Sequence, residues 1–107
     1  MNLVEFDFCV AADHPSLPGH FPQQPIVPGV LLLDHLLCQL QRATGRSVLC
    51  LRQVKFSAAL QPQERAHARC EVDGDCVAFR VTVSRQGAAV TAATGRLSLG
   101  PDRGAAA

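Results

Sequence analysis

The sequence has little net charge, no long apolar run and no recognisable leader, and each absence excludes a class of protein. The formal net charge is +1, and no run of Lys and Arg is interleaved with aromatic residues, which argues against nucleic-acid binding. The leucine-rich apolar run Val30–Leu33 resumes only after Asp34 and His35, so it is too short to cross a bilayer. Residues Met1–Glu5 lack the basic region and apolar stretch of a signal peptide. We therefore expect a cytoplasmic protein.

The cysteines do not form a disulfide framework. Their number is odd, they are widely spaced, and no Cys-x-x-Cys pair occurs. We predict reduced, buried thiols at Cys9, Cys38, Cys50, Cys70 and Cys76.

Length and composition favour one globular domain. A chain of 107 residues with 48% hydrophobic residues supports one hydrophobic core and not two. We expect this single domain to span residues 1–99. Residues 100–107 offer little that could pack, so we expect a flexible C-terminal tail there.

Hydrophobic periodicity predicts an α+β fold. Residues Leu3–Val10 alternate as in a strand with one covered face, and the proline-rich segment Ala11–Pro28 predicts a long ordered loop. Residues Val30–Thr44 are typical of a helix that Gly45 ends. Later strands separated by short turns are predicted at Val48–Phe56, Ala66–Val72, Cys76–Ser84 and Ala88–Leu99. Short links favour antiparallel neighbours, so we expect a curved antiparallel sheet that encloses the helix.

The first half of this helix is apolar on nearly every side, because its leucines cannot share one stripe at 3.6 residues per turn. We expect other elements to surround it. Asp34 would then lie in an apolar environment, where a carboxylate is costly unless it is protonated, paired or beside a polar cavity. A carboxyl kept protonated could donate to a leaving hydroxyl, although a structural Asp bonded to loop amides would have the same sequence.

Two further features lie just before Asp34. His20 sits in the proline-stiffened loop, where an imidazole can be held in one orientation and exchange protons near neutral pH; a surface or capping histidine is the alternative. Gly29 begins the helix, so its amide and that of Val30 lack intrahelical acceptors at the positive end of the dipole. Together these residues supply a base, an electrophilic amide site and an acid, whereas a plain helix start would explain Gly29 alone.

The stretch from Gly19 to Gly29 resembles the FabA/FabZ-type 3-hydroxyacyl-[acyl-carrier-protein] dehydratases of the hot-dog superfamily. Their pattern, Gly-His-Phe-x-x-x-Pro-x-x-Pro-Gly followed by an acidic helix residue, is matched at Gly19, His20, Phe21, Pro25, Pro28, Gly29 and Asp34. FabZ-type enzymes usually have Glu at the acidic position and FabA-type enzymes Asp. Residues Leu51–Phe56 also look like the strand that follows the hot-dog helix.

The resemblance implies a hot-dog fold and roles for particular residues. His20 would take the α-proton, the amides of Gly29 and Val30 would hold the thioester carbonyl, and Asp34 would assist departure of the hydroxyl. Apolar residues expected to line the acyl tunnel are Phe21, Val30, Leu33 and Phe56. The family joins subunits through their sheets, so His20 and Asp34 would meet across the interface of a homodimer, a heterodimer or a higher oligomer. No metal or organic cofactor is implied.

The implied partner is acyl carrier protein with its phosphopantetheine-linked acyl chain. Because that carrier is acidic, its contacts should be basic; the candidates are Arg42, Arg46, Arg52, Lys55 and Arg65. The pathway would be fatty acid or polyene/polyketide-type biosynthesis, and the short length is similar to that of dehydratases in aryl-polyene pigment pathways.

Three alternatives stay open at this point. A hot-dog thioesterase would hydrolyse the same thioester, and a non-catalytic acyl-binding or scaffold subunit would do no chemistry. A metal site of His14, His20 and Asp34 is disfavoured, because no ligand pair has metal spacing. His67, in a predicted strand, is expected to be structural.

Overall fold

The computed structural model describes residues 2–10, 27 and 29–102. In this part of the chain, five strands and one helix follow in the order β1 (Asn2–Phe8), α1 (Gly29–Thr44), β2 (Arg46–Phe56), β3 (Ala66–Asp73), β4 (Cys76–Arg85) and β5 (Ala88–Asp102). The predicted elements are all present, most with ends shifted by one or two residues. The loop predicted at Ala11–Pro28 lies outside the described residues except for Val27.

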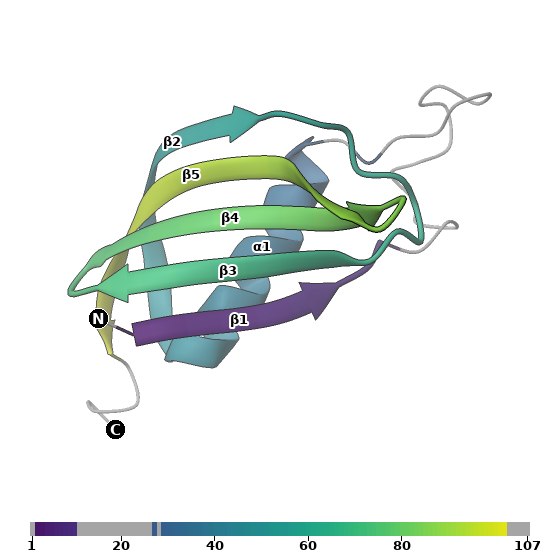
Figure 1. The fold of residues 1–107 in the computed structure, drawn as a ribbon. Coiled ribbons are helices and arrows are strands. Elements are labelled where there is room, and N and C mark those ends of the chain that lie inside the picture. The colour runs from purple at the N-terminus through teal and green to yellow at the C-terminus, as the bar shows by residue number, and fades with distance from the viewer. Residues whose placement is uncertain (1, 11–26, 28, 103–107) are drawn as a thin grey trace.

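The strands form one antiparallel sheet in the order β1-β3-β4-β5-β2. Two-residue turns join its central strands, with positive φ at Gly74 between β3 and β4 and at Gln86 and Gly87 between β4 and β5, as tight hairpins require. The sheet curves around α1, which lies against one of its faces (Figure 1). The predicted α+β arrangement of a curved antiparallel sheet around one helix is confirmed.

The core lies between the helix and the inner face of the sheet. Strict alternation along β3 and β4 buries every second side chain, because successive residues of a strand point to opposite faces. The helix contributes a stripe of buried leucines, each of which stabilises the fold by about 1.5–3 kcal/mol: Leu31, Leu32, Leu36 and Leu40.

The helix is not enclosed on all sides, which corrects the expectation from its composition. Val30 is 76% exposed, Asp34 and Cys38 are exposed, and Leu33 and Leu37 are half-buried. The physical reason is that a single curved sheet covers one side of a helix, and no other described element covers the opposite side. The described helix also lacks the combination of length and apolarity that crossing a membrane requires.

The prediction of buried thiols holds only for Cys70. Its side chain faces the core, and burial raises the pKa of this thiol to about 11, because a thiolate is poorly solvated there. The other four cysteines are free and exposed. Their positions on the outer face or edge of the fold could not be read from spacing alone.

Residues 100–102, which were expected to begin the flexible C-terminal tail, belong to the last strand. Strand β5 continues to Asp102, and Gly100 is buried. Arg46 holds this end, since its guanidinium donates to the carbonyls of Gly100 (2.6 Å) and Gly74 (2.7 Å) and pairs with Asp75. These bonds, together with the 16% exposure of its side chain, correct the prediction that Arg46 is an accessible contact for a carrier protein. Residues 103–107 lie outside the described part.

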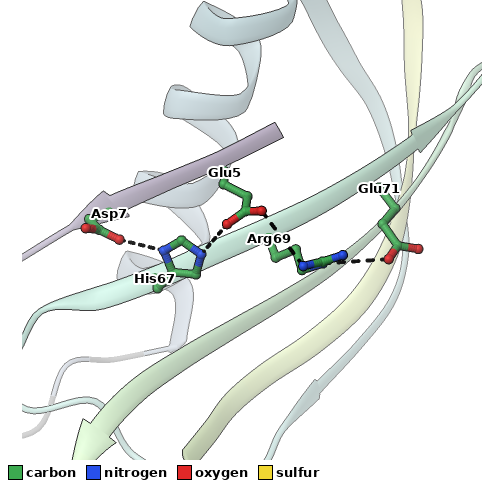
Figure 2. A network of polar contacts seen from close by, with 5 residues as sticks. All are labelled: Glu5, Asp7, His67, Arg69 and Glu71. Atoms are coloured by element: carbon green, nitrogen blue, oxygen red, sulfur yellow. Dashed lines mark hydrogen bonds and ion pairs between the residues drawn. The ribbon is translucent and has the colours of Figure 1, made fainter. Parts of the chain in front are cut away.

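A polar network on the outer face ties the edge strand β1 to β3 (Figure 2). The imidazole of His67 on β3 lies 2.7 Å from a carboxylate oxygen of Asp7 through Nδ1 and 2.8 Å from one of Glu5 through Nε2. A neutral ring has one N–H and can donate to only one carboxylate, whereas a protonated ring donates to both. The hydrogen bond to Asp7 is the largest cause that raises the pKa of His67, desolvation opposes it, and the bond to Glu5 adds to it. Arg69 continues the network between Glu5 and Glu71, at 3.8 Å from each.

We predict that this network makes stability pH-dependent. Because the pKa of His67 is raised above its unfolded value of about 6.5, its contribution is complete below that value and is lost as pH rises through the folded pKa. His67→Gln should therefore be less stable than wild type at about pH 6, and the difference should shrink by about pH 8.5. Urea unfolding at both pH values measures this, and an equal difference at both would contradict it. The carboxylates that act directly on His67 are Asp7 and Glu5. Arg65, just before β3, lies 4.0 Å from Asp7, and Arg69 on β3 lies 3.8 Å from Glu5.

Candidate functional site

An apolar hollow of about 580 Å³ opens beside the amino terminus of α1. One wall comes from the start of the helix and the other from the end of β2 and the segment after it. The lining residues are Val27, Gly29, Val30, Leu32, Phe56, Ser57, Ala58, Ala59 and Leu60. Pockets with a mostly apolar lining and a few polar groups at one end are typical of sites for small apolar ligands.

The mouth of this hollow depends on a close approach between Gly29 and Phe56. A Cβ atom at Gly29 would lie 2.7 Å from Cζ of the Phe56 ring, a distance that real carbon contacts do not reach. Glycine is therefore required for the ring to pack here, for a steric reason that does not involve φ. The helix begins at Gly29, so its first amides lack intrahelical acceptors and lie at the positive end of the dipole, next to the hollow.

The second wall is held by backbone hydrogen bonds to two distant parts of the chain. The amides of Ser57 and Ala58 both donate to the carbonyl of Ala92 on β5 (2.8 and 3.3 Å), and the amide of Val27 donates to the carbonyl of Leu60 (2.7 Å). The last bond joins the described end of the proline-rich segment to the pocket wall. Sequence reasoning included Phe56 but missed residues 57–60, because a short stretch of small residues carries no periodic signal.

The structure brings together three of the seven predicted site residues. Gly29, Val30 and Phe56 all line the hollow. Leu33 does not line it; this residue is half-buried and packs against the core, because it points to a different side of the helix. His20 and Phe21 lie outside the described residues.

Asp34 is exposed, not buried as expected. It lies four residues after Val30 and therefore one turn along the same side of the helix, the side that no described element covers. Asp34 therefore shares a helix side with Val30, which lines the hollow, but does not line the hollow itself. The neighbouring His35 turns toward β1, where its ring stacks on Phe8 with centroids 5.7 Å apart and planes 3° apart.

The metal alternative involves His14 and His20, which lie outside the described residues. Within the described ranges, no group of three or more His, Cys, Asp or Glu side chains could hold a metal ion.

A second hollow of about 650 Å³ lies on the outer face of the sheet. Charged side chains such as Lys55, Arg80 and Arg96 line it, and alternation along the strands places them on the face opposite the helix. It contains none of the motif residues, and its lining is about as polar as apolar, whereas the lining of the hollow at the helix terminus is mostly apolar. The apolar hollow at the helix terminus is therefore the candidate site.

Solved structures show the same fold. The dehydratase heterocomplex ApeI:P from Xenorhabdus doucetiae contains a chain with a TM-score of 0.75 and 26% identity, over 92% of this chain and 88% of that one. A mutant of the fluoroacetyl-CoA-specific thioesterase FlK has a TM-score of 0.57 at 16% identity, over 92% of this chain and 84% of that one. At that identity the second likeness shows the fold alone.

Sequence relatives are dehydratases. The 3-hydroxyacyl-[acyl-carrier-protein] dehydratase FabZ of Allorhizobium ampelinum is 36% identical over 81 residues, which are 72% of this chain and 49% of the relative. The chain thus spans about half the length of this curated relative. A family model described as ApeI-like, ApeI dehydratase, matches residues 1–96. This match covers most of the chain and shows that the protein belongs to the ApeI-like dehydratase family.

Proposed function

We propose that this chain removes water from 3-hydroxyacyl chains carried on acyl carrier protein and forms the trans-2-enoyl thioester. The observation that carries the proposal is the apolar hollow at the helix amino terminus, which joins Gly29, Val30 and Phe56 at the end of the Gly-His-Phe-x-x-x-Pro-x-x-Pro-Gly motif. The hollow suits an acyl chain, and the helix amides beside it suit a thioester carbonyl. Membership of a dehydratase family and similarity to FabZ support the same reaction.

In the proposed mechanism, the thioester carbonyl accepts hydrogen bonds from the amides of Gly29 and Val30, which stabilise negative charge on its oxygen. The imidazole of His20 takes the proton from C2, and the electron pair of that C–H bond forms the C2=C3 double bond. The C3–O bond breaks, and the leaving hydroxyl takes a proton from the carboxyl of Asp34 to depart as water. Proton exchange with solvent then returns both side chains to their starting states.

The exposure of Asp34 supports a second subunit as part of the site. The uncovered side of α1 carries Val30 and Asp34, and edge strand β2 exposes Leu49 (69%) and Leu51 (40%). The outer edge of β2 pairs with no other described strand, and such edges associate readily with another strand. We propose that two hot-dog subunits, identical or related, join through β2, so that His20 of one subunit meets Asp34 of the other.

The carrier protein is proposed to approach through the remaining basic contacts. Of those expected, Arg42, Arg52 and Lys55 are exposed, and Arg65 is 80% exposed beside Asp7. A product of repeated dehydration would suit a polyene pathway. The cytoplasmic location expected from the sequence stays a prediction.

Removal of either proposed proton-transfer group should abolish most activity. His20→Ala and Asp34→Asn should each lower the dehydration rate by about 10²–10⁴-fold, the usual contribution of a general acid or base. The rate is measured by mass spectrometry on 3-hydroxyacyl and enoyl carrier proteins, with Asp73→Asn, an exposed carboxylate at the end of β3, as the control. Free thiol release without reversible hydration would instead establish a thioesterase, and equal rates for wild type and His20→Ala would favour a silent acyl-binding subunit.

Gly29→Ala should impair catalysis more than folding. The new methyl group would displace the Phe56 ring at the pocket mouth, and we expect kcat/KM to fall about tenfold. Helix propensity favours alanine by about 0.5–1 kcal/mol, so the thermal midpoint should change little. In a Phe56→Ala background the same substitution should have a much smaller effect on kcat/KM; an equal effect in both backgrounds would contradict the steric explanation.

The β2 edge can be tested by sedimentation. Wild type should sediment as a dimer or larger, whereas Leu49→Asp should shift it to monomer and remove activity, because a charge would be buried in the joined sheet. Leu3→Asp, at a 48% exposed leucine on the opposite edge, is the matched control and should leave the assembly intact. A fully active wild-type monomer would overturn the shared site.

A further inference from the structure

The wall of the apolar hollow is fixed from outside the pocket by an ion pair. The segment 57–65, which we name the wall segment, connects β2 to β3, and its first four residues line the hollow. It forms only an isolated bridge at Leu60 and no continuous ladder, so its position depends on a few individual hydrogen bonds. Three of them come from the side chain of Arg85, the last residue of β4.

Arg85 binds the wall segment at two points. Its Nε and Nη2 donate to the two carboxylate oxygens of Glu64, each at 2.7 Å, and Nη2 also donates to the carbonyl of Ala59 at 2.5 Å. The bidentate form of this pair fixes orientation as well as distance. Both side chains are largely covered, with 31% of Arg85 and 17% of Glu64 exposed. The bond to Arg85 is the main cause that lowers the pKa of Glu64, and the same bond raises the pKa of Arg85.

The turn that presents Glu64 is under backbone strain. Gln63 has a φ of 65°, a left-handed conformation that favours glycine and costs about 1–3 kcal/mol for other residues. Such a conformation persists only where surrounding contacts hold it. Here Gln63 donates its amide to the carbonyl of Val10 (2.7 Å), while Glu64 accepts the amide of Gln61 (3.1 Å). The turn therefore delivers the Glu64 carboxylate to Arg85 in a defined place.

We propose that Arg85 is a positioning residue that determines which acyl chains enter the hollow. It does not line the pocket; it acts through the carbonyl of Ala59, a lining residue, and through Glu64. With both points held, residues 57–60 keep a fixed distance from Gly29 and Val30 across the hollow. This inference rests on the proposed function only in taking the acyl thioester as the ligand.

If Arg85 only stabilised the fold, its substitution would have a different pattern of effects. Partly exposed ion pairs contribute little to global stability, and a general loss of stability would reduce activity on every substrate alike. If residues 57–60 were displaced, the effect on each substrate would instead depend on how much of its acyl chain contacts them. The dependence of KM on acyl-chain length therefore distinguishes the two roles of Arg85.

The test compares Arg85→Ala and Arg85→Lys with wild type on short-chain and long-chain 3-hydroxyacyl carrier proteins. We expect KM for the long chain to rise about tenfold, as for lost ground-state binding. The kcat and the KM for the short chain should change by less than about twofold. Lysine cannot reproduce the planar fork, so Arg85→Lys should resemble Arg85→Ala. Arg80→Ala, on the same strand but exposed on the outer face and in no ion pair with a described residue, is the control. A uniform change across chain lengths, or none, would overturn the proposal.

A second readout does not depend on catalysis. Saturated acyl-pantetheines of the same two lengths cannot lose water, and their dissociation constants should show the same length-dependent change in Arg85→Ala. Amide hydrogen exchange of Ala58, Ala59 and Leu60 should also become faster in this variant. If wild type binds these probes but dehydrates no substrate, and Arg85→Ala still shows the length-dependent change in binding, the proposed function is contradicted and the positioning role is supported. Unchanged binding and exchange in Arg85→Ala would refute the positioning role whatever the activity.

Discussion

The leucine stripe of α1 packs against the inner face of the sheet and holds the helix and the sheet together. Leu36 and Leu40 are fully buried, and truncation of such a side chain to alanine typically costs about 2–5 kcal/mol. Because the stripe fixes the rotation of the helix about its axis, it also fixes which residues face outward. Val30 and Asp34 are consequently placed on the open side, at the end where the helix begins.

This orientation links the chemistry to assembly. An aspartate on the uncovered side of a helix is well solvated in a single chain, and it becomes part of a low-dielectric site only when another surface covers it. The exposed leucines of edge strand β2 lie along the border where such a surface would join. The proposed reaction and the proposed subunit contact therefore depend on the same feature, namely that one curved sheet covers only one side of its helix.

The pocket combines segments that are far apart in the chain. The helix start and the end of β2 meet where the Phe56 ring passes Gly29, and the second wall is bonded to Ala92 on β5 and to Arg85 on β4. The rigid sheet thus supports a wall that has little regular structure of its own. Functional sites are commonly built in this way, with irregular segments held by a stable scaffold.

The order and type of the elements could be predicted from the chain alone, because period-2 alternation, a leucine-rich segment and turn residues are local signals. The motif and the strand after the helix, which carry a specific resemblance, also pointed to Gly29, Val30 and Phe56, and these three residues line one hollow. Contacts between distant elements, by contrast, leave Asp34 exposed, pack the half-buried Leu33 against the core, leave four cysteines outside it, and make Arg46 and Arg85 structural ties and not free cations. Those properties depend on which side of an element another element covers, and contacts between residues as distant as Ala59 and Arg85 leave no local trace in the chain.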